Sequence, residues 1–372
     1  MAVAAVIDRA QQPLKNKKVI IMQTVLTKIA LAASLAVALS ACGTVGQDFT
    51  APANVAGIGT FRHGAAAADA AQLPKDWWSI YGDATLNRLE QSALQDNPSV
   101  KAAGERLLQA LAQSGTARAN QGPSVNVSTG ISNSRTSANT SQGLALGNRS
   151  ISGNNFSVGG SLSYEVDLLG RVKRLVEAAD AQALAAQADR DGVLLMLSSQ
   201  VASNYWQLRG LDAEMAILNG ALDTRRESAQ LVEARFNAGL TNELDLARAK
   251  VELSNAQADL HEVKRQRNQL ENSLATLTGK PPSALQLPVA ADPSILPLPP
   301  AIPVGLPASL LAHRPDLVSS VAGLRAANAQ VGVAEGAFYP SLQLTGNFGY
   351  ASEKLRDLAQ GGSRQFSFGP LA

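Results

Sequence analysis

The chain has 372 residues, a formal net charge of +2, and only 17% charged and 4% aromatic residues. This length suits one large domain or two ordinary ones, and the absence of a basic stripe argues against nucleic-acid binding. One cysteine cannot build an internal disulfide framework, and three widely separated histidines lack the spacing of a zinc site. The sequence also shows no nucleophile–base pair, no metal-ligand cluster and no phosphate-binding loop. We therefore expect that the protein is not an enzyme and binds no metal.

The N-terminal segment 1–41 is predicted to be a secretory signal peptide. A short apolar run, 29–39, is followed by small residues and preceded by four lysines: Lys15, Lys17, Lys18 and Lys28. About 11 apolar residues are too few to cross a bilayer core of roughly 30 Å. Both Met1 and Met22 fit as the start of this signal.

Cys42 directly follows this apolar run, after Ser40 and Ala41, and the stretch resembles a bacterial lipobox. That resemblance implies cleavage before Cys42 and a covalent lipid on its thiol, with several acyl chains giving a firm anchor. The alternative is a chance cysteine in an ordinary signal. Gly43, rather than an aspartate, favours sorting to the outer membrane. We expect residues 42–75 to form a lipidated N-terminal strap.

Two stretches of the chain align without a gap at an offset of about 217 residues. Pro98 aligns with Pro315 and Pro123 with Pro340, so prolines match at both ends of the frame. The segment FSVGG also matches a later FSFGP after a shorter loop. The alternative is chance similarity between alanine-rich helices. We interpret the pattern as an internal duplication, in which each unit contains a helix, a strand, a loop and a second strand.

This duplication predicts the domain organisation. The first repeat is expected over 76–280 and the second, incomplete repeat over 308–372. A proline-rich segment, 281–307, is too stiff and too poor in N–H groups for the interior of a helix or sheet. It is predicted to be an extended linker.

Three segments alternate apolar and polar residues with the period of two that is typical of strands, and the repeat implies a fourth strand at FSFGP. Each spans roughly 9–11 residues, the length of a tilted membrane-spanning strand. The side chains at the polar positions are mostly small and hydroxylated, and they include Asn126 and Gln343. Such a face suits a water-filled lumen. Residues 132–155 are predicted to be a polar loop. A soluble antiparallel sheet with one wet face explains the pattern almost as well. If the strands do line a pore, four cannot close it, which implies a barrel shared between subunits.

Two long helices are predicted between the second strand and the linker. Residues 171–237 contain no proline and would form about 100 Å of helix. A return helix from Glu243 to about Thr278 carries apolar residues at heptad positions. The pattern is interrupted at Arg225 in the first helix and at Arg267 in the second. Joined by a short turn, the two helices should form an antiparallel coiled-coil hairpin.

The turn between these helices, NAGLTNELD, contains the residues such a turn needs. Gly239 suits the left-handed conformation that ends a helix, and either Thr241 or Asn242 suits the cap of the next one. Asp245 lies in the first turn of the second helix, where a carboxylate interacts favourably with the helix dipole.

Four motifs together resemble the TolC-like outer-membrane factor family, and within it the NodT-type efflux lipoproteins. They are WWSIYGDATLNRLEQSALQDNPSVKAA, RFNAGLTNELDLARAKVEL, GLPASLLAHRPDL and AFYPSLQLTGNFGY. The resemblance runs from Cys42 to the last residue. It implies a mainly helical fold with membrane strands, in which a homotrimer shares a twelve-stranded barrel above a long periplasmic helical tunnel.

The resemblance also implies a function and site residues. The function would be passive export of small molecules through the outer-membrane duct of a tripartite efflux system, together with a periplasmic adaptor and an inner-membrane pump. Cys42 matches the acylated residue that meets outer-membrane lipid, and no cofactor beyond that covalent lipid is implied. Gly239, Leu240 and Thr241 match the periplasmic tip that contacts the adaptor. Asp245 matches an acid that helps to hold the tunnel entrance closed in relatives.

Other interpretations remain. A lipid-anchored periplasmic adaptor or a structural coiled-coil lipoprotein would explain the hairpin and the lipobox, although not the repeated strands. The repeat offset also predicts about 100 further residues that would contain a second helical hairpin, whereas the chain stops inside the fourth strand. Half of the tunnel wall would then be missing, so a non-functional fragment of the duct is a further possibility.

Overall fold

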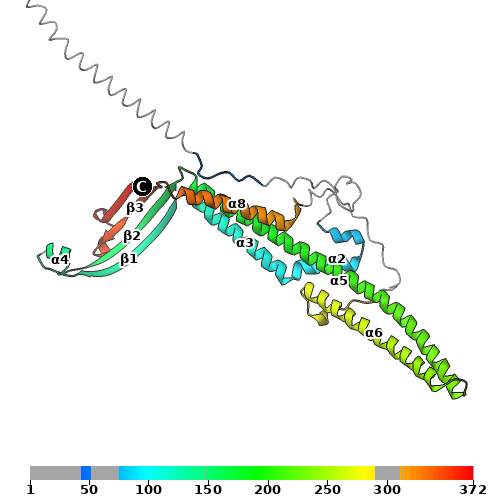
Figure 1. Ribbon diagram of the computed structural model, residues 1–372. Coiled ribbons are helices and arrows are strands. Elements are labelled where there is room, and N and C mark those ends of the chain that lie inside the picture. Colours follow the sequence, from blue (N-terminus) through cyan, green and yellow to red (C-terminus); the bar gives the residue numbers. More distant parts are fainter. Residues whose placement is uncertain (1–42, 52–74, 146, 290–310, 312, 372) are drawn as a thin grey trace, which may run out of the picture. The chain divides into compact units, whose positions relative to one another are not determined.

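The computed structural model describes residues 43–51, 75–145, 147–289, 311 and 313–371 (Figure 1). The chain divides into two compact units, each assembled from separated stretches of sequence. Among the described residues, one unit takes 43–50, 113–180 and 325–371, and the other takes 51, 75–112, 181–289 and the described part of 311–324. These units cut across the segments expected from the repeat, because three helices each contribute residues to both.

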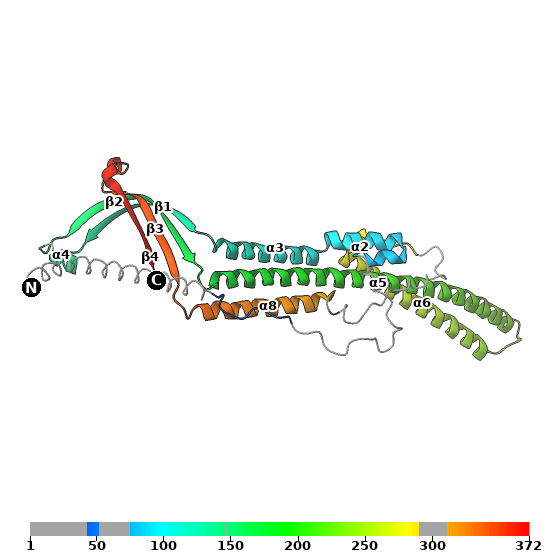
Figure 2. The same cartoon turned by 90° about the horizontal axis from the view of Figure 1, so that it is seen from above.

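A four-stranded antiparallel sheet dominates the first unit, with the strands in chain order β1-β2-β3-β4 (Figures 1 and 2). Its strands are β1 (Ser124–Thr136), β2 (Ile151–Val166), β3 (Leu342–Ser352) and β4 (Arg364–Leu371). A short helix, α4 (Ser141–Ala145), lies between β1 and β2, and two single-turn 3-10 helices, η3 (Leu355–Asp357) and η4 (Gly361–Ser363), lie between β3 and β4.

The first hairpin of this sheet corrects one prediction. Residues 132–155 were expected to form a loop, but β1 continues to Thr136 and β2 begins at Ile151. The polar residues there sustain the ladder because they pair across it: the Asn133 Nδ2 group donates to Asn154 Oδ1 at 2.7 Å. Cross-strand pairs of this kind stabilise a sheet without apolar side chains.

Two helices of equal length carry the aligned sequences. The helix α3 (Pro98–Ala119) and the helix α8 (Pro315–Gly336) each contain 22 residues. The offset of 217 residues therefore relates the first residue of α3 to the first of α8, and the last residue of α3 to the last of α8. Each helix is followed within a few residues by a strand, β1 after α3 and β3 after α8.

The second unit contains most of the long helical hairpin, while residues 171–180 of its first helix belong to the first unit. The helix α5 (Arg171–Asn237) has 67 residues and α6 (Glu243–Leu277) has 35, which confirms the predicted bounds closely. Both views show α6 running back beside the distal part of α5 (Figures 1 and 2). The same unit also contains the 3-10 helix η1 (Trp77–Tyr81), the helix α2 (Ala84–Asp96), the 3-10 helix η2 (Pro282–Ala284) and parts of α3 and α8.

An apolar core joins α2 to the hairpin within the second unit. Its centre contains Leu86 on α2, Tyr205 and Leu208 on α5, and Leu274 on α6, all of them fully buried. Trp77, Tyr81 and Trp206 pack around this centre. Burial of such large side chains is the main stabilising contribution to the packing of α2 on the hairpin.

Asn97 separates α2 from α3 and also contacts the end of α6. Its side-chain oxygen accepts from the Ser99 amide at 2.7 Å, and its Nδ2 group donates to the Leu277 carbonyl at 2.9 Å. Close by, Gly279 has φ +70°, and a Cβ there would lie 2.8 Å from the Asp96 carbonyl oxygen. Only glycine fits this approach, which explains why α6 stops where the sequence predicts.

Candidate functional site

The register of the sheet sorts its residues into two chemically different faces. Residues directly opposite one another across antiparallel strands point to the same face. One row across all four strands is apolar: Val127, Gly160, Phe348 and Phe366. The adjacent row is polar: Asn126, Ser161, Asn347 and Ser367. This arrangement confirms the alternation predicted from sequence, including a polar face that carries Asn126 and Gln343.

Aromatic rings cover glycines on the apolar face. A Cβ placed on Gly160 would lie 2.5 Å from the Phe348 ring, and one on Gly346 would lie 2.6 Å from the Phe368 ring. Each ring therefore lies over the glycine of the neighbouring strand. The packing keeps large apolar groups flat against the sheet, while Phe348 and Phe368 stay 53% and 72% exposed. Such a face suits contact with an apolar solvent.

The two helices of the hairpin meet at the turn that the sequence singled out. Gly239 has φ +71°, the left-handed conformation, and the Leu240 amide donates to the Arg235 carbonyl at 2.8 Å. Asn242 caps α6, with its Oδ1 accepting from the Asp245 amide at 2.9 Å. Of the two cap candidates, the structure thus selects Asn242.

Thr241 and Asp245 form a contact of their own across this turn. The Thr241 hydroxyl donates to Asp245 Oδ2 at 2.8 Å. Gly239 and Asp245 are exposed, and Leu240 projects with 77% of its surface exposed. The structure therefore brings all four predicted tip residues together on an accessible surface. The Asp245 carboxylate lies in the first turn of α6, where it interacts favourably with the helix dipole, and it also accepts the hydrogen bond from Thr241.

Ion pairs across the hairpin explain one of the two interruptions in the heptad pattern. Arg225 on α5 pairs with Glu252 on α6 at 3.2 Å, and Lys250 on α6 pairs with Glu233 on α5 at 3.0 Å. All four side chains are about half exposed, so each pair contributes little energy. The two pairs can still favour one register of the hairpin, because a shift of α6 along α5 would separate the opposite charges.

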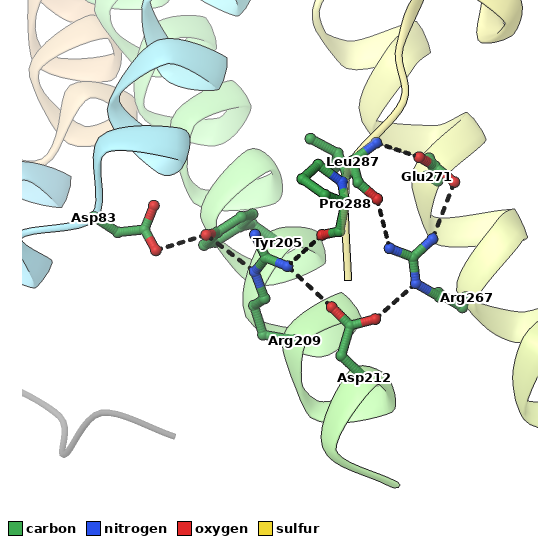
Figure 3. A network of polar contacts seen from close by, with 8 residues as sticks. All are labelled: Asp83, Tyr205, Arg209, Asp212, Arg267, Glu271, Leu287 and Pro288. Carbon is green, nitrogen blue, oxygen red and sulfur yellow. Dashed lines mark hydrogen bonds and ion pairs between the residues drawn. The ribbon is translucent and has the colours of Figure 1, made fainter. Parts of the chain in front are cut away.

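The other interruption, Arg267, belongs to a buried network that the sequence did not reveal (Figure 3). Its Nε donates to Asp212 Oδ1 at 2.7 Å, and its Nη1 donates to Glu271 at 3.2 Å. Its Nη2 donates to the Leu287 carbonyl at 2.7 Å, and the Leu287 amide donates to Glu271. Asp212 is fully buried and Arg267 nearly so. The network fixes the segment after η2 against α6.

The same network continues to the start of α2 (Figure 3). Arg209 donates to Asp212 Oδ2 at 3.0 Å, to the Pro288 carbonyl at 3.0 Å and to the Tyr205 hydroxyl at 3.1 Å. The Tyr205 hydroxyl in turn donates to Asp83, the N-cap of α2, at 2.6 Å. Burial, together with this bond to Asp83, raises the pKa of Tyr205 to about 12. Tyr205 therefore remains a donor throughout the physiological pH range.

A second buried acid, Glu90, stands apart from this network. It is fully buried on the core side of α2, and neither of its carboxyl oxygens has a hydrogen-bond partner among the described residues. Burial without compensation raises the pKa of Glu90 to about 8. The side chain is therefore mainly neutral at pH 7.

Some expectations fall outside what the structure describes. Cys42 lies outside the described residues, as do the signal peptide and most of the proline-rich linker. In the described ranges, no group of three or more His, Cys, Asp or Glu side chains is placed to hold a metal ion. No helix of the described part is long and apolar enough to cross a membrane.

Comparison with known proteins decides the family. The sequence profile of the outer membrane efflux proteins matches residues 89–280 and 306–372. The chain belongs to the outer membrane efflux protein family. Members of this TolC-like family are efflux channels and not enzymes, which confirms both the resemblance and the expectation of no catalysis.

Individual efflux proteins resemble the chain over most of its length. Outer membrane protein OprJ of Pseudomonas aeruginosa is 34% identical over 298 residues, or 79% of this chain. The probable efflux pump outer membrane protein TtgC of Pseudomonas putida is 31% identical over 82% of the chain. The chain spans 61% of the length of OprJ and 62% of that of TtgC.

Solved efflux channels share the fold. The outer-membrane channel OprN superposes with a TM-score of 0.75 and 28% identity over 88% of this chain and 72% of its own. The Campylobacter jejuni channel CmeC gives a TM-score of 0.76 and 26% identity over 88% of this chain and 70% of its own. These likenesses confirm the expected combination of long helices with a four-stranded antiparallel sheet.

Proposed function

We propose that this chain is the outer-membrane component of an efflux system and that it lets small molecules leave the cell passively. The observation that supports this proposal most strongly is the sheet, in which one face carries mostly small polar residues and the other carries exposed apolar ones. A sheet with that pattern fits between lipid and a water-filled lumen. Membership of the efflux family supports this function over a periplasmic adaptor or a purely structural lipoprotein.

The proposal includes a homotrimer with a shared barrel. Within the described residues, β1 and β4 are the two edges of the sheet and each is paired on one side only. An open edge in lipid leaves backbone groups without partners, and in the proposed barrel the strands of other copies of the chain would pair with these edges. Three copies would give twelve strands, and the helices would line a periplasmic tunnel. In this proposed arrangement, the polar face of the sheet would line the lumen.

The proposed partners are a periplasmic adaptor and an inner-membrane pump that supplies the energy. The tip residues Gly239, Leu240, Thr241 and Asp245 would contact the adaptor, and Leu240 offers an exposed apolar anchor for it. We further propose that Cys42 carries a covalent lipid, which anchors the chain in the outer membrane with its helices in the periplasm. Relatives are named for efflux of antibiotics, of toluene and of pyoverdine, so the proposed cargo class is small molecules.

One experiment tests this function. Outer membranes containing the chain are solubilised in mild detergent and analysed by electrophoresis with and without heating, and the purified protein is added to planar bilayers. We expect a detergent-stable trimer that dissociates on heating and conducts ions. A monomer that high salt washes off the membrane, without conductance, contradicts the duct.

A further inference from the structure

Residues 44–48, which follow Cys42 closely, are bound to the helices of the first unit. The Val45 amide donates to the Leu169 carbonyl at 2.8 Å, directly before α5 begins. On the other side, the Asn328 side chain on α8 donates to the Gln47 carbonyl at 2.9 Å. The segment therefore lies between the start of α5 and the helix α8.

Arg174 on α5 is the centre of this contact. Its Nε donates to the Val45 carbonyl at 3.0 Å, and its Nη2 donates to the Gly46 carbonyl at 2.9 Å and to Asp48 at 2.8 Å. Its Nη1 donates to Glu177 at 2.7 Å, which holds the guanidinium in place. The Arg174 side chain is only 4% exposed. A rigid guanidinium serves several carbonyl acceptors at once in a way that a lysine ammonium does not.

Glycines make the close approach possible. Gly46 has φ +82°, and a Cβ on it would lie 2.6 Å from the Gly332 Cα atom on α8. A Cβ on Gly332 would in turn lie 3.1 Å from both the Val45 carbonyl oxygen and the Arg174 Cγ atom. The repeat offset relates Gly332 to Gly115, where an added Cβ would meet no heavy atom within 4 Å. The duplicated helices thus differ at the point where the N-terminal segment binds.

Exposed apolar side chains also lie at two strand–helix junctions of this unit. Leu168 lies between β2 and α5, and Phe338 and Tyr339 lie between α8 and β3. They are 48%, 88% and 53% exposed, respectively. Aromatic and apolar groups at the ends of membrane strands are typical of the lipid–water interface.

We propose that Arg174 positions the lipid anchor by binding residues 45–48 and fixing the chain after Cys42 at these junctions, where the acyl chains enter the lipid beside the sheet. This inference rests on the lipidation of Cys42 proposed above. Only three peptide units separate Cys42 from Val45, a reach of at most about 11 Å. The acyl chains are then held at the end of the sheet where the strands begin, and they keep the sheet next to the membrane during insertion.

Hydrogen exchange tests whether Arg174 binds the segment. In the purified, lipidated protein in detergent, we expect Arg174→Ala to speed exchange of the Val45 amide about tenfold or more. Gly332→Val should do the same, because its side chain would push against Val45. The matched control is Gly115→Val, which introduces the same residue at the same repeat position with no neighbour to displace. An unchanged Val45 exchange rate in Arg174→Ala overturns the proposal.

A second measurement separates positioning of the anchor from general stability. Radiolabelled palmitate reports lipidation, and the heat-modifiable fraction of outer-membrane protein reports insertion of the sheet. We expect Arg174→Ala to lower that fraction several-fold in the lipidated protein. In a Cys42→Ser protein exported by an ordinary cleavable signal, the same substitution should have no further effect.

The outcomes distinguish the two proposals. An equal loss of insertion in both backgrounds means that Arg174 acts only on the fold, which overturns the positioning role. Absence of palmitate from the unaltered chain contradicts the lipidation and with it the anchor, even when the exchange data show that the segment is bound. Labelled protein with normal insertion in Arg174→Ala overturns the positioning role while leaving the proposed duct intact.

Discussion

Glu90 is a buried acid whose ionisation opposes folding. Its pKa is about 8 in the folded chain against an ordinary value of 4.5. Below pH 4.5 the side chain is neutral in both states and its ionisation has no effect on stability. As the pH rises from 4.5 to about 8, the unfolded chain releases this proton and the folded chain keeps it. The free energy of unfolding therefore falls over that window and levels off above it.

Replacing Glu90 with glutamine should remove this pH dependence. We expect Glu90→Gln to raise the free energy of unfolding at pH 7 by up to roughly 3 kcal/mol, and by nothing at pH 4. Thermal melting followed by circular dichroism across this range measures the difference. The exposed Glu105→Gln on α3 is the control and should leave the melting curve unchanged at every pH. A glutamine variant that is less stable at pH 7 means that the Glu90 carboxyl has a partner.

Arg267 supports a buried network, so its loss should be costly. Arg267→Leu leaves Asp212 with Arg209 alone and removes the donor to the Leu287 carbonyl. Breaking a buried ion pair on one side typically costs about 3–5 kcal/mol. We expect a clearly lower melting temperature, measured in the same detergent as the unaltered protein.

The control for this substitution lies two residues away. Arg265 pairs with Glu262 on the exposed side of the same helix, so Arg265→Leu should change the melting temperature little. Similar losses for Arg265→Leu and Arg267→Leu would show that the Asp212 network contributes nothing specific.

At the scale of elements, Gly239 sets the turn of the hairpin. A side chain in the left-handed conformation costs roughly 1–2 kcal/mol, so Gly239→Ala should destabilise the distal hairpin. Gly220→Ala, inside α5 and with no heavy atom within 4 Å of the added Cβ, should instead stabilise slightly. Hydrogen exchange of amides near the tip distinguishes the two, and equal protection in both variants contradicts the role of this turn.

The two helices of the hairpin were predictable from sequence to within a residue or two, because local residues mark where each of them begins and ends. The short helix α4 was not predicted, since its residues were expected to belong to a loop. The absence of proline fixes the extent of α5, and Gly239, Asn242 and Gly279 mark the turns. Strand ends were less predictable. The outer part of the first hairpin is polar, and the Asn133–Asn154 bond that extends it depends on cross-strand register, which no single segment encodes.

The buried network was beyond sequence analysis for a related reason. Arg267 appeared only as an interruption of a heptad, and its partner Asp212 lies 55 residues away on another helix. Arg225 interrupts its own helix in the same way, yet its ion pair is exposed. Pattern alone does not separate a buried arginine from an exposed one, because burial is decided by the partner helix and by the segment after η2.

At the scale of the whole molecule, adjacent residues on β1 should respond oppositely to charge. Val127 belongs to the apolar face and Ser128 to the polar face. A charged side chain on a lipid-facing position is destabilising, by about 2–4 kcal/mol for arginine or lysine at the midplane and by less for aspartate or near the interface. We therefore expect Val127→Asp to reduce the amount of protein inserted in the outer membrane.

Ser128→Asp should insert normally and shift conductance toward cations, because the polar face would line the lumen. Quantitative blotting of outer membranes and reversal potentials in planar bilayers measure the two effects. Normal insertion of Val127→Asp, together with loss of Ser128→Asp, would assign the faces the other way round.

The paired register also sets the changes in length that the sheet tolerates during evolution. The strand β2 is hydrogen-bonded on both sides, so losing one of its residues would move every following side chain to the opposite face, while losing two would restore the faces. Viable length variants of β2 should therefore differ by even numbers of residues. The connection that contains α4 is free of this even-number constraint, because it only joins two strands. Related sequences should accordingly show gaps of any length around residues 137–150 and almost none within β2.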